Sequence, residues 1–95
     1  MPAYVIAEVN ITDAAGYEEY KRLAPPAIAK YGGRYLARGG ETAVMEGDWT
    51  PSRLVILEFE NLEKAKAWYE SPEYAVARKA REGKATMRVV VTAGL

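Results

Sequence analysis

Apolar residues alternate with other residues along the first part of the chain. In the segment YVIAEVNI (residues 4–11) every odd-numbered position is apolar, whereas the even-numbered positions include Glu8 and Asn10. A two-residue period rich in β-branched and aromatic side chains is typical of a half-buried β-strand. Similar patterns predict strands at residues 53–59 (RLVILEF) and 86–93 (TMRVVVTA), and shorter extended segments at residues 34–38 and 42–46.

A three- and four-residue spacing replaces the alternation in the next segment, TDAAGYEEYKRLAPPAIAKYGG. Its apolar positions predict a helix whose N-cap is Asp13. They are Tyr17, Tyr20, Ala24, Ile28 and Tyr31. Pro25 and Pro26 predict a kink or a restart, because proline has no N–H for the helical hydrogen bonds. Gly32 stands where a left-handed C-terminal cap is expected.

A second helical region follows the strand at residues 53–59. Asn61 is a suitable N-cap for a helix in which Leu62, Ala65, Trp68 and Tyr69 share a face. The run Ser71-Pro72-Glu73 predicts a restart, because it combines a cap, a first-turn proline and an acid near the positive helix end. We expect this helical region to last to about Glu82.

The order of predicted elements is β-α-β-β-α-β, which indicates an α+β fold of the ferredoxin-like type. Ninety-five residues correspond to one domain, spanning residues 1–95. In this topology the first and third strands are central, and both helical regions cover one face of a four-stranded antiparallel sheet. Gly39-Gly40 permits either a tight hairpin or a bend in one long strand, and we favour the bend.

The strand faces predict an assembly. One face, which we assign to the helices, is formed by Val5, Ala7, Val9, Val55, Leu57, Phe59, Met87, Val89 and Val91. The opposite face offers Tyr4, Ile6, Leu36, Leu54, Ile56 and Val90. This second face is too apolar to remain in water. We therefore expect a homodimer in which two sheets pack face to face, with Trp49 as a further dimer anchor.

Composition removes several classes of function. The chain has 13 basic and 13 acidic residues, and this balance argues against nucleic acid as the main partner. It lacks an apolar stretch that could span a bilayer, and its beginning lacks the pattern of a secretory signal, so we expect a cytoplasmic protein with no membrane partner. Because cysteine and histidine are absent, the usual transition-metal sites and nucleophilic triads are excluded, and we expect no cofactor and no metal.

Four charged residues are the candidates for chemistry. Glu8 and Glu58 stand on otherwise apolar strand faces, where a raised pKa would suit a general acid or base. Arg38, beside the glycine pair, could bind a carboxylate or an enolate. If alternation holds through all four strands, these residues and Arg88 point into the space between two sheets. The alternative is structural, with each carboxylate paired to Arg38 or Arg88 or lying at a wet sheet edge.

Candidate ligand-binding residues surround the break in the second helical region. Trp68, Tyr69 and Tyr74 could wall a pocket, and the backbone N–H groups after Ser71 could hold an anion. The alternative is that these aromatic residues are core. Two further candidates are charged, Glu46, which flanks the Gly39-Gly40 bend opposite Arg38, and Arg88.

The runs YGGRYLARGG, EGDW and AWYESPEY resemble the DUF1330 family of small bacterial proteins, part of the dimeric α/β-barrel superfamily. The similarity extends over nearly the whole chain. It implies a four-stranded sheet from each subunit, a barrel-like dimer and a cavity between sheet and helices. Relatives with this fold include cofactor-free monooxygenases of polycyclic aromatics, muconolactone isomerases, haem-degrading proteins and EthD-like proteins. Haem handling in such relatives usually uses a histidine, which this chain lacks.

Two hypotheses of function follow. The first is a small cofactor-independent enzyme, monooxygenase-like or isomerase-like, that orients a small carbonyl compound or aromatic acid in the cavity. Glu8 or Glu58 would then move a proton, and Arg38 would stabilise negative charge. The second is a non-catalytic dimeric module that binds a small ligand or has a structural role, in which the charged residues fix the register.

Overall fold

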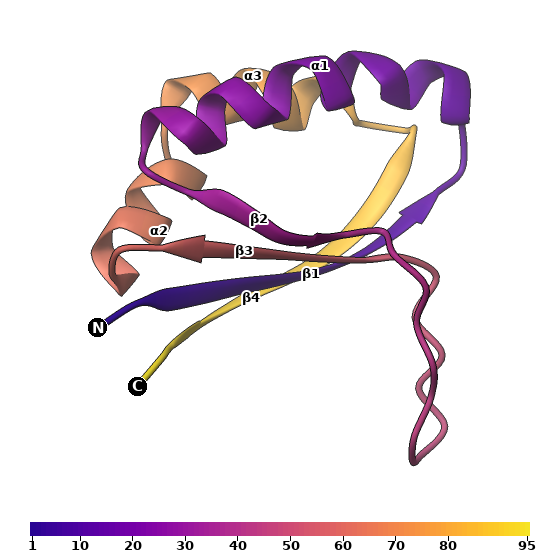
Figure 1. Cartoon of the computed structure of the whole chain (residues 1–95). Coiled ribbons are helices and arrows are strands. Elements are labelled where there is room, and N and C mark those ends of the chain that lie inside the picture. The colour runs from indigo at the N-terminus through magenta and orange to yellow at the C-terminus, as the bar shows by residue number, and fades with distance from the viewer.

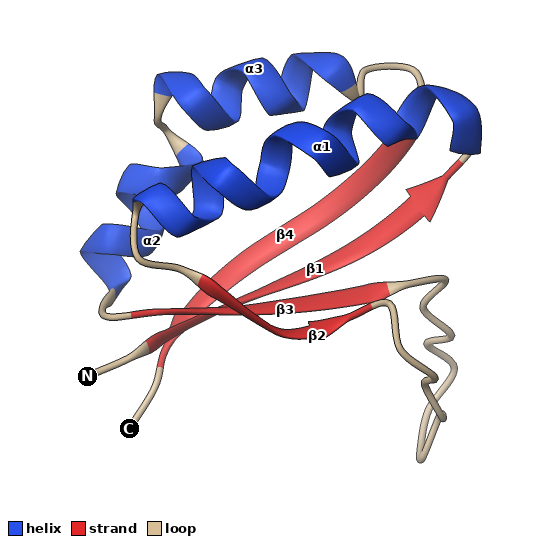
Figure 2. Cartoon of the chain, turned by 45° about the horizontal axis from the view of Figure 1, so that its top comes forward, coloured by secondary structure: helices blue, strands red, loops and turns tan.

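A four-stranded antiparallel sheet carries three helices on one of its faces (Figures 1 and 2). The computed structural model describes all residues from 1 to 95. The elements in chain order are β1 (Ala3–Ile11), α1 (Ala14–Lys30), β2 (Arg34–Arg38), β3 (Leu54–Phe59), α2 (Leu62–Tyr69), α3 (Pro72–Ala80) and β4 (Ala85–Ala93). The strand order is β2-β3-β1-β4. The ferredoxin-like topology is thus confirmed, with the first and third strands in the centre.

The predicted helix caps are present. The Asp13 side chain accepts a hydrogen bond from Gly16 N at 3.0 Å, and Asn61 accepts one from Lys64 N at 2.8 Å. At the end of α1, Gly32 has a φ of +81°, which favours glycine. The N–H groups of Gly32 and the next residue bond back to the last turn of the helix, as in a Schellman motif.

Helix α1 does not restart at its two prolines. It runs without interruption from Ala14 to Lys30, with Pro25 and Pro26 inside it. The missing N–H groups leave two carbonyls without their usual donors, but Ala24 and Ile28 are buried on either side of the prolines. Packing against the sheet therefore holds both halves of α1 in line.

The segment between β2 and β3 differs from the prediction. The extended stretch expected at residues 42–46 is not a strand, and residues 39–53, which we term the arm, leave the sheet after Arg38. The arm projects away from the helices on the other side of the sheet (Figures 1 and 2). Its tip is exposed, with Met45 92% accessible. The bend favoured at Gly39-Gly40 therefore leads out of the sheet rather than into a longer strand.

The core lies between the helices and the face of the sheet predicted for them. Its buried members include Val5, Val9, Leu57 and Phe59 from the strands, and Tyr74 from α3. The opposite face, termed the outer face below, is formed by Tyr4, Ile6, Leu36, Leu54, Ile56 and Val90. All six of these side chains are partly or fully exposed in the single chain.

A β-bulge in β2 changes the face on which Arg38 lies. Tyr35 pairs with Leu57, but Arg38 pairs with Val55, because the register shifts by one residue between Tyr35 and Ala37. Strict alternation would have placed Arg38 on the outer face. The bulge instead returns it to the helix side, where it lines a cavity. The expectation that Arg38 shares the outer face with Glu8, Glu58 and Arg88 is therefore wrong.

Candidate functional site

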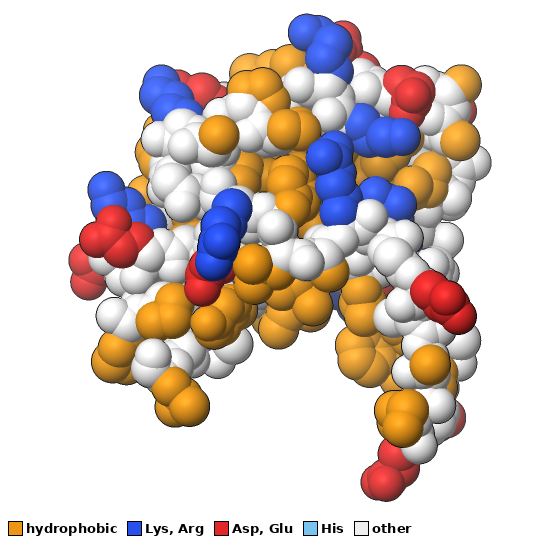
Figure 3. All heavy atoms as spheres, in the orientation of Figure 1, with side chains coloured by type: hydrophobic (Ala, Val, Ile, Leu, Met, Phe, Trp, Pro, Cys, Tyr) orange, Lys and Arg blue, Asp and Glu red, His pale blue; other side chains and the backbone are white.

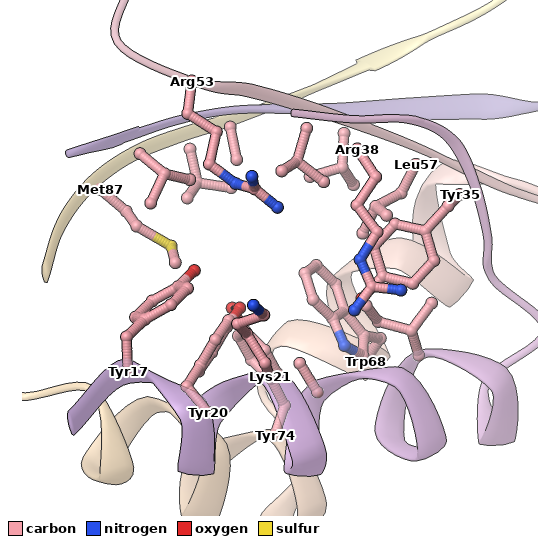
Figure 4. A pocket seen from close by; sticks show the side chains of 17 residues that line it. Tyr17, Tyr20, Lys21, Tyr35, Arg38, Arg53, Leu57, Trp68, Tyr74 and Met87 are labelled. Atoms are coloured by element: carbon pink, nitrogen blue, oxygen red, sulfur yellow. The ribbon is translucent and has the colours of Figure 1, made fainter. Parts of the chain in front are cut away.

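The helix layer and the sheet enclose a cavity that opens to solvent between α1 and β2 (Figure 3). Its lining comes from β1, α1, β2, β3, α2, α3 and β4, and is mostly hydrophobic. Figure 4 shows the side chains that converge on it, among them Tyr17, Tyr20, Tyr74, Arg38 and Arg53. The cavity has a volume of about 40 Å³. Room for several water molecules is thus present before any side chain moves.

Aromatic rings form the floor of this cavity. The rings of Tyr17 and Tyr20 stack with centroids 5.1 Å apart, and those of Trp68 and Tyr74 lie 4.3 Å apart. The hydroxyl oxygens of Tyr20 and Tyr74 are separated by 2.7 Å, so α1 and α3 are linked by a buried hydrogen bond. A floor fixed in this way suits a flat ligand, because ring faces offer large contact areas at low conformational cost.

Three tyrosine hydroxyls of the cavity, those of Tyr17, Tyr20 and Tyr35, remain protonated at neutral pH. Burial raises the pKa of Tyr17 to about 12, although the positive charge of Arg53 acts in the opposite direction. Burial also raises the pKa of Tyr20, and the neighbouring Tyr74 adds to this effect. The pKa of Tyr35 is raised by burial against the influence of Arg38. These phenols therefore serve as hydrogen-bond donors rather than as bases.

Three cationic side chains, Lys21, Arg38 and Arg53, line the cavity, and no carboxylate does. Neither Arg38 nor Arg53 forms an ion pair with an acidic residue of the chain, whereas Lys21 Nζ lies 2.9 Å from an oxygen of Glu18. Two arginines that border an apolar space without a counterion attract an anion. The site is therefore electrostatically suited to a negatively charged ligand.

Gly39 positions Arg53 in the cavity. The backbone of Gly39 has a φ of +71°, and a Cβ at this residue would overlap the guanidinium group of Arg53. Two backbone hydrogen bonds hold the ends of the arm at this point, from Gly39 N to Leu54 O and from Val9 N to Arg53 O, both at 2.8 Å. The glycine at position 39 of the RGG run therefore allows the Arg53 side chain to lie against the main chain.

Two buried donors of the cavity residues have no partner. They are the Nε atom of Arg53 and the Nε1 atom of Trp68. Buried N–H groups are normally satisfied, because leaving one unpaired costs about 1–3 kcal/mol. Arg38, by contrast, stacks its guanidinium over the ring of Tyr35, with 4.4 Å from Cζ to the ring centroid. The cavity thus contains two N–H donors without an acceptor, and a cation–π contact lies at its rim.

The structure places Glu8 and Arg88 together on the outer face. Arg88 Nε donates to Glu8 Oε1 at 2.7 Å, and Trp49 Nε1 donates to Glu8 Oε2 at 3.1 Å. The hydrogen bonds from Trp49 and Arg88 lower the pKa of Glu8. This lowering is opposite to the raised pKa that a general acid requires. The pairing matches the structural alternative, in which Glu8 meets Arg88.

Glu58 and Glu46 also lie away from the cavity. Glu58 accepts a hydrogen bond from Arg34 Nε at 2.7 Å, a partner that the sequence did not indicate. Glu46 is exposed on the arm. The four charged candidates therefore do not share one cavity, and Arg38 alone among them reaches it. The catalytic assignment of Glu8 and Glu58 stays a prediction made from the sequence.

The aromatic candidates divide between cavity and surroundings. Trp68 and Tyr74 line the cavity and are also core residues, and their binding of a ligand stays a prediction. Tyr69 faces a neighbouring hollow beside β4 and contacts Trp68 edge to face. Ser71 is the N-cap of α3, since its Oγ accepts from Tyr74 N at 3.1 Å and donates to Trp68 O at 2.7 Å.

Sequence reasoning missed several cavity residues for which a signal existed. Arg53 precedes Val55, Leu57 and Phe59 in the same alternation, which places it on the helix side of the sheet. Lys21 lies one turn from Tyr17, next to the buried stripe of α1, and is itself exposed. The sequence identifies Tyr17 and Tyr20 only as apolar positions of the predicted helix. The spacing of Arg53 and Lys21 relative to these apolar residues was the signal that would have predicted their place beside the cavity.

The described residues contain no cluster of three or more Asp and Glu side chains that could hold a metal ion. No helix of the structure has both the length and the apolar character needed to cross a membrane.

The fold and the site together define a small ferredoxin-like protein with a cationic, aromatic cavity between its helices and its sheet. The chain belongs to the family described as Domain of unknown function (DUF1330), whose model matches residues 2–95. No functionally curated protein matches the sequence.

Several solved structures share the fold. RPA0582, a protein of unknown function from Rhodopseudomonas palustris, superimposes with a TM-score of 0.77 at 20% identity over 99% of this chain and 82% of its own. SnoaB, a cofactor-independent oxygenase from Streptomyces nogalater, gives 0.69 at 13% identity over 99% and 93%. A dimeric ferredoxin-like protein of unknown function from Jannaschia sp. CCS1 gives 0.70 at 11% identity over 99% and 100%. At these identities the similarity establishes the fold alone.

Proposed function

We propose that this protein is a homodimer that binds a planar organic acid, as its anion, in the cavity between helices and sheet. The observation that carries this proposal is the grouping of Lys21, Arg38 and Arg53 around an aromatic cavity that contains no carboxylate. The acid group of the ligand pairs with the arginines, and its ring lies on the aromatic floor. Self-association is supported by the exposed outer face and by the dimeric description of a protein of the same fold.

The size of the cavity restricts the ligand. About 40 Å³ is less than a single aromatic ring requires, so binding displaces side chains at the mouth. Lys21 is exposed there and can turn outward, whereas Tyr20 and Tyr74 are held by their hydrogen bond. A ligand of one or two fused rings therefore fits this cavity better than a larger one.

We further propose an oxygenase activity on ketones whose acidic methylene group ionises, so that the ketone is held as its enolate anion and the enzyme converts the methylene group to a second carbonyl group. The unpartnered Arg53 Nε supports this proposal, because a preorganised donor stabilises the charge that develops on an enolate oxygen. The proton leaves to water at the open mouth. The enolate carbon then adds O₂, the resulting peroxide anion takes a proton back from water, and the hydroperoxide loses water, so CH₂ and O₂ become C=O and H₂O without an external reductant. The cofactor-independent oxygenase SnoaB has the same fold.

Binding is tested by calorimetry with 1-naphthoate and salicylate, and with their methyl esters as neutral controls. The acids should bind and the esters should not. Arg53→Met and Arg38→Met should each weaken binding by about 10- to 100-fold, the value of a hydrogen bond to a charged group. Arg22→Met, which removes an exposed arginine on the solvent side of α1, should leave binding unchanged. Equal binding of acid and ester would overturn the proposal.

The oxygenase step is tested with 2-tetralone in an oxygen electrode. The expected result is uptake of one O₂ for each diketone formed, without hydrogen peroxide. Arg53→Met should slow this uptake, whereas Arg22→Met should not. If the acids bind but no tested ketone consumes O₂, the protein is a non-catalytic binding module, which is the second hypothesis that the sequence supports.

A further inference from the structure

The arm joins the two features on which the proposed function rests. It begins directly after Arg38 and ends at Arg53, so both cavity arginines stand at its roots. The tip of the arm projects on the outer-face side of the sheet (Figure 1). One segment therefore connects the ligand cavity with the surface on which a second copy is proposed to dock.

Few contacts within its own chain hold the arm in place. Residues 39–50 are all exposed, including the apolar side chains of Val44, Met45 and Trp49. Trp49 supplies a single side-chain hydrogen bond, to Glu8 on the outer face, and its ring lies beside Ile6 and Val90. Figure 3 shows hydrophobic side chains on the arm and on the underside of the sheet, on both sides of a concave region. An exposed apolar segment of this kind requires a partner.

The charges of the outer face favour a second copy as that partner. Glu8 is paired with Arg88 and Glu58 with Arg34, so the charged residues of this face neutralise one another. An isologous interface brings a surface against itself, and it therefore excludes an uncompensated charge of one sign. The outer face is apolar and its charges are paired within the chain, so a second copy can pack against it without bringing like charges together.

The length of the arm limits how far it can reach. Seven residues lead from Gly39 to Met45, and about 3.3 Å per extended residue gives a reach of at most about 23 Å. Two sheets packed face to face are separated by only about 10 Å. An arm of this length is therefore long enough for its tip to pass the opposing sheet and to contact the side of the second copy.

We propose that the arm is a dimer clasp that couples subunit association to the cavity. Val44 and Met45 pack on the partner subunit, and this contact holds the roots of the arm, hence Arg38 and Arg53, in their cavity positions. The coupling is reciprocal, because a ligand that fixes the arginines also favours the docked arm. This inference rests on the proposed function for the identity of the dimer face and of the cavity.

The test replaces Met45 with aspartate, which adds a charge at an exposed position without disturbing the core. Sedimentation equilibrium should show a dimer dissociation constant raised by about tenfold or more, as expected for an anchor residue of an interface. Val76→Asp is the matched control, since Val76 is an exposed apolar residue on α3, away from the outer face. A dissociation constant unchanged by Met45→Asp would overturn the clasp.

The coupling has a readout that needs no ligand. The amide of Gly39, which donates to Leu54 O at the root of the arm, should exchange its hydrogen faster in Met45→Asp than in the wild type at the same protein concentration. Unchanged exchange in a protein whose dimer has dissociated would overturn the coupling. Failure of 1-naphthoate to bind would count against the proposed function alone, because both of these measurements are made without it.

Discussion

The hydroxyl oxygens of Tyr20 and Tyr74 lie 2.7 Å apart in the core, and they join α1 to α3 across 54 residues of sequence. Only one of the two hydroxyls can donate along this contact, so the proton of the other is directed elsewhere. Both residues line the cavity, which offers the place for that proton. The pair is thus a structural tie between helices and a source of one hydrogen-bond donor for a ligand.

Removing one hydroxyl of this pair should lower the free energy of unfolding by more than the net contribution of the hydrogen bond. Tyr20→Phe should lower the free energy of unfolding by about 1–3 kcal/mol, because the buried Tyr74 hydroxyl loses its partner. The double variant with Tyr74→Phe should cost less than the sum of the two single changes, with a coupling of about 1 kcal/mol. Urea unfolding of the four proteins measures this coupling. Additive effects would show that the hydroxyls do not interact in solution.

A change at Gly39 should affect both stability and ligand binding. Gly39→Ala forces a side chain onto a residue with a φ of +71° and displaces the Arg53 guanidinium. We expect a loss of about 1–2 kcal/mol in the free energy of unfolding. We also expect the affinity for 1-naphthoate to fall about tenfold or more, from the loss of a charged hydrogen bond.

The neighbouring glycine provides the control for this change. Nothing lies within 4 Å of the position a Cβ would take at Gly40, and its φ is not positive. Gly40→Ala should therefore leave both unfolding and ligand binding close to those of the wild type. Equal effects of the two substitutions on calorimetric binding would show that Gly39 does not position Arg53.

Glu73 should make stability depend on pH in the acid range. Its carboxylate accepts hydrogen bonds from Lys30 and Tyr31, and together with a backbone N–H these lower the pKa of Glu73 to about 2 from an ordinary value of 4.5. A lowered pKa in the folded state adds stability above pH 4.5 that is lost as the pH falls from 4.5 toward 2. Glu73→Gln should therefore destabilise the protein at pH 7 and have little effect near pH 2, as measured by denaturant unfolding at both values.

Tyr17 should produce the opposite dependence in alkali. Burial raises the pKa of Tyr17 to about 12 from an ordinary value of 10. A raised pKa gives stability that is complete below pH 10 and disappears as the pH rises through 12. Thermal unfolding between pH 9 and 12 should show a less steep loss of stability in Tyr17→Phe than in the wild type. Identical slopes would mean that Tyr17 titrates with an ordinary pKa.

Period and capping residues were sufficient to predict the fold. The alternation around Val5 and Leu57 identified the helix side of the sheet, and Asp13, Asn61 and Ser71 marked the helix starts. These signals are local, because caps and side-chain alternation depend on residues near one another in sequence. The strand expected at residues 42–46 does not form, because Thr42 and Val44 favour extended structure but this segment has no neighbouring strand to pair with.

The site was less predictable because it depends on register and on long-range contacts. The bulge that returns Arg38 to the cavity leaves no clear signal in the sequence, and a shift of one residue changes the face of every side chain that follows. The Tyr20–Tyr74 bond joins residues whose proximity results from the packing of two helices. The burial of Trp68 and Tyr74 was predictable from the sequence, because both of their alternative roles, core and cavity wall, require it.

The bulge in β2 also has a genetic consequence. Leu36 is the extra residue between Tyr35, which pairs with Leu57, and Ala37, which pairs with Ile56. Loss of its single codon would leave a regular strand in which Tyr35 and Arg38 still face the cavity. The outer face alone would lose a side chain. Natural variation can therefore alter the outer side of β2 through gain or loss of one codon, while the cavity side of the same strand is inherited unchanged.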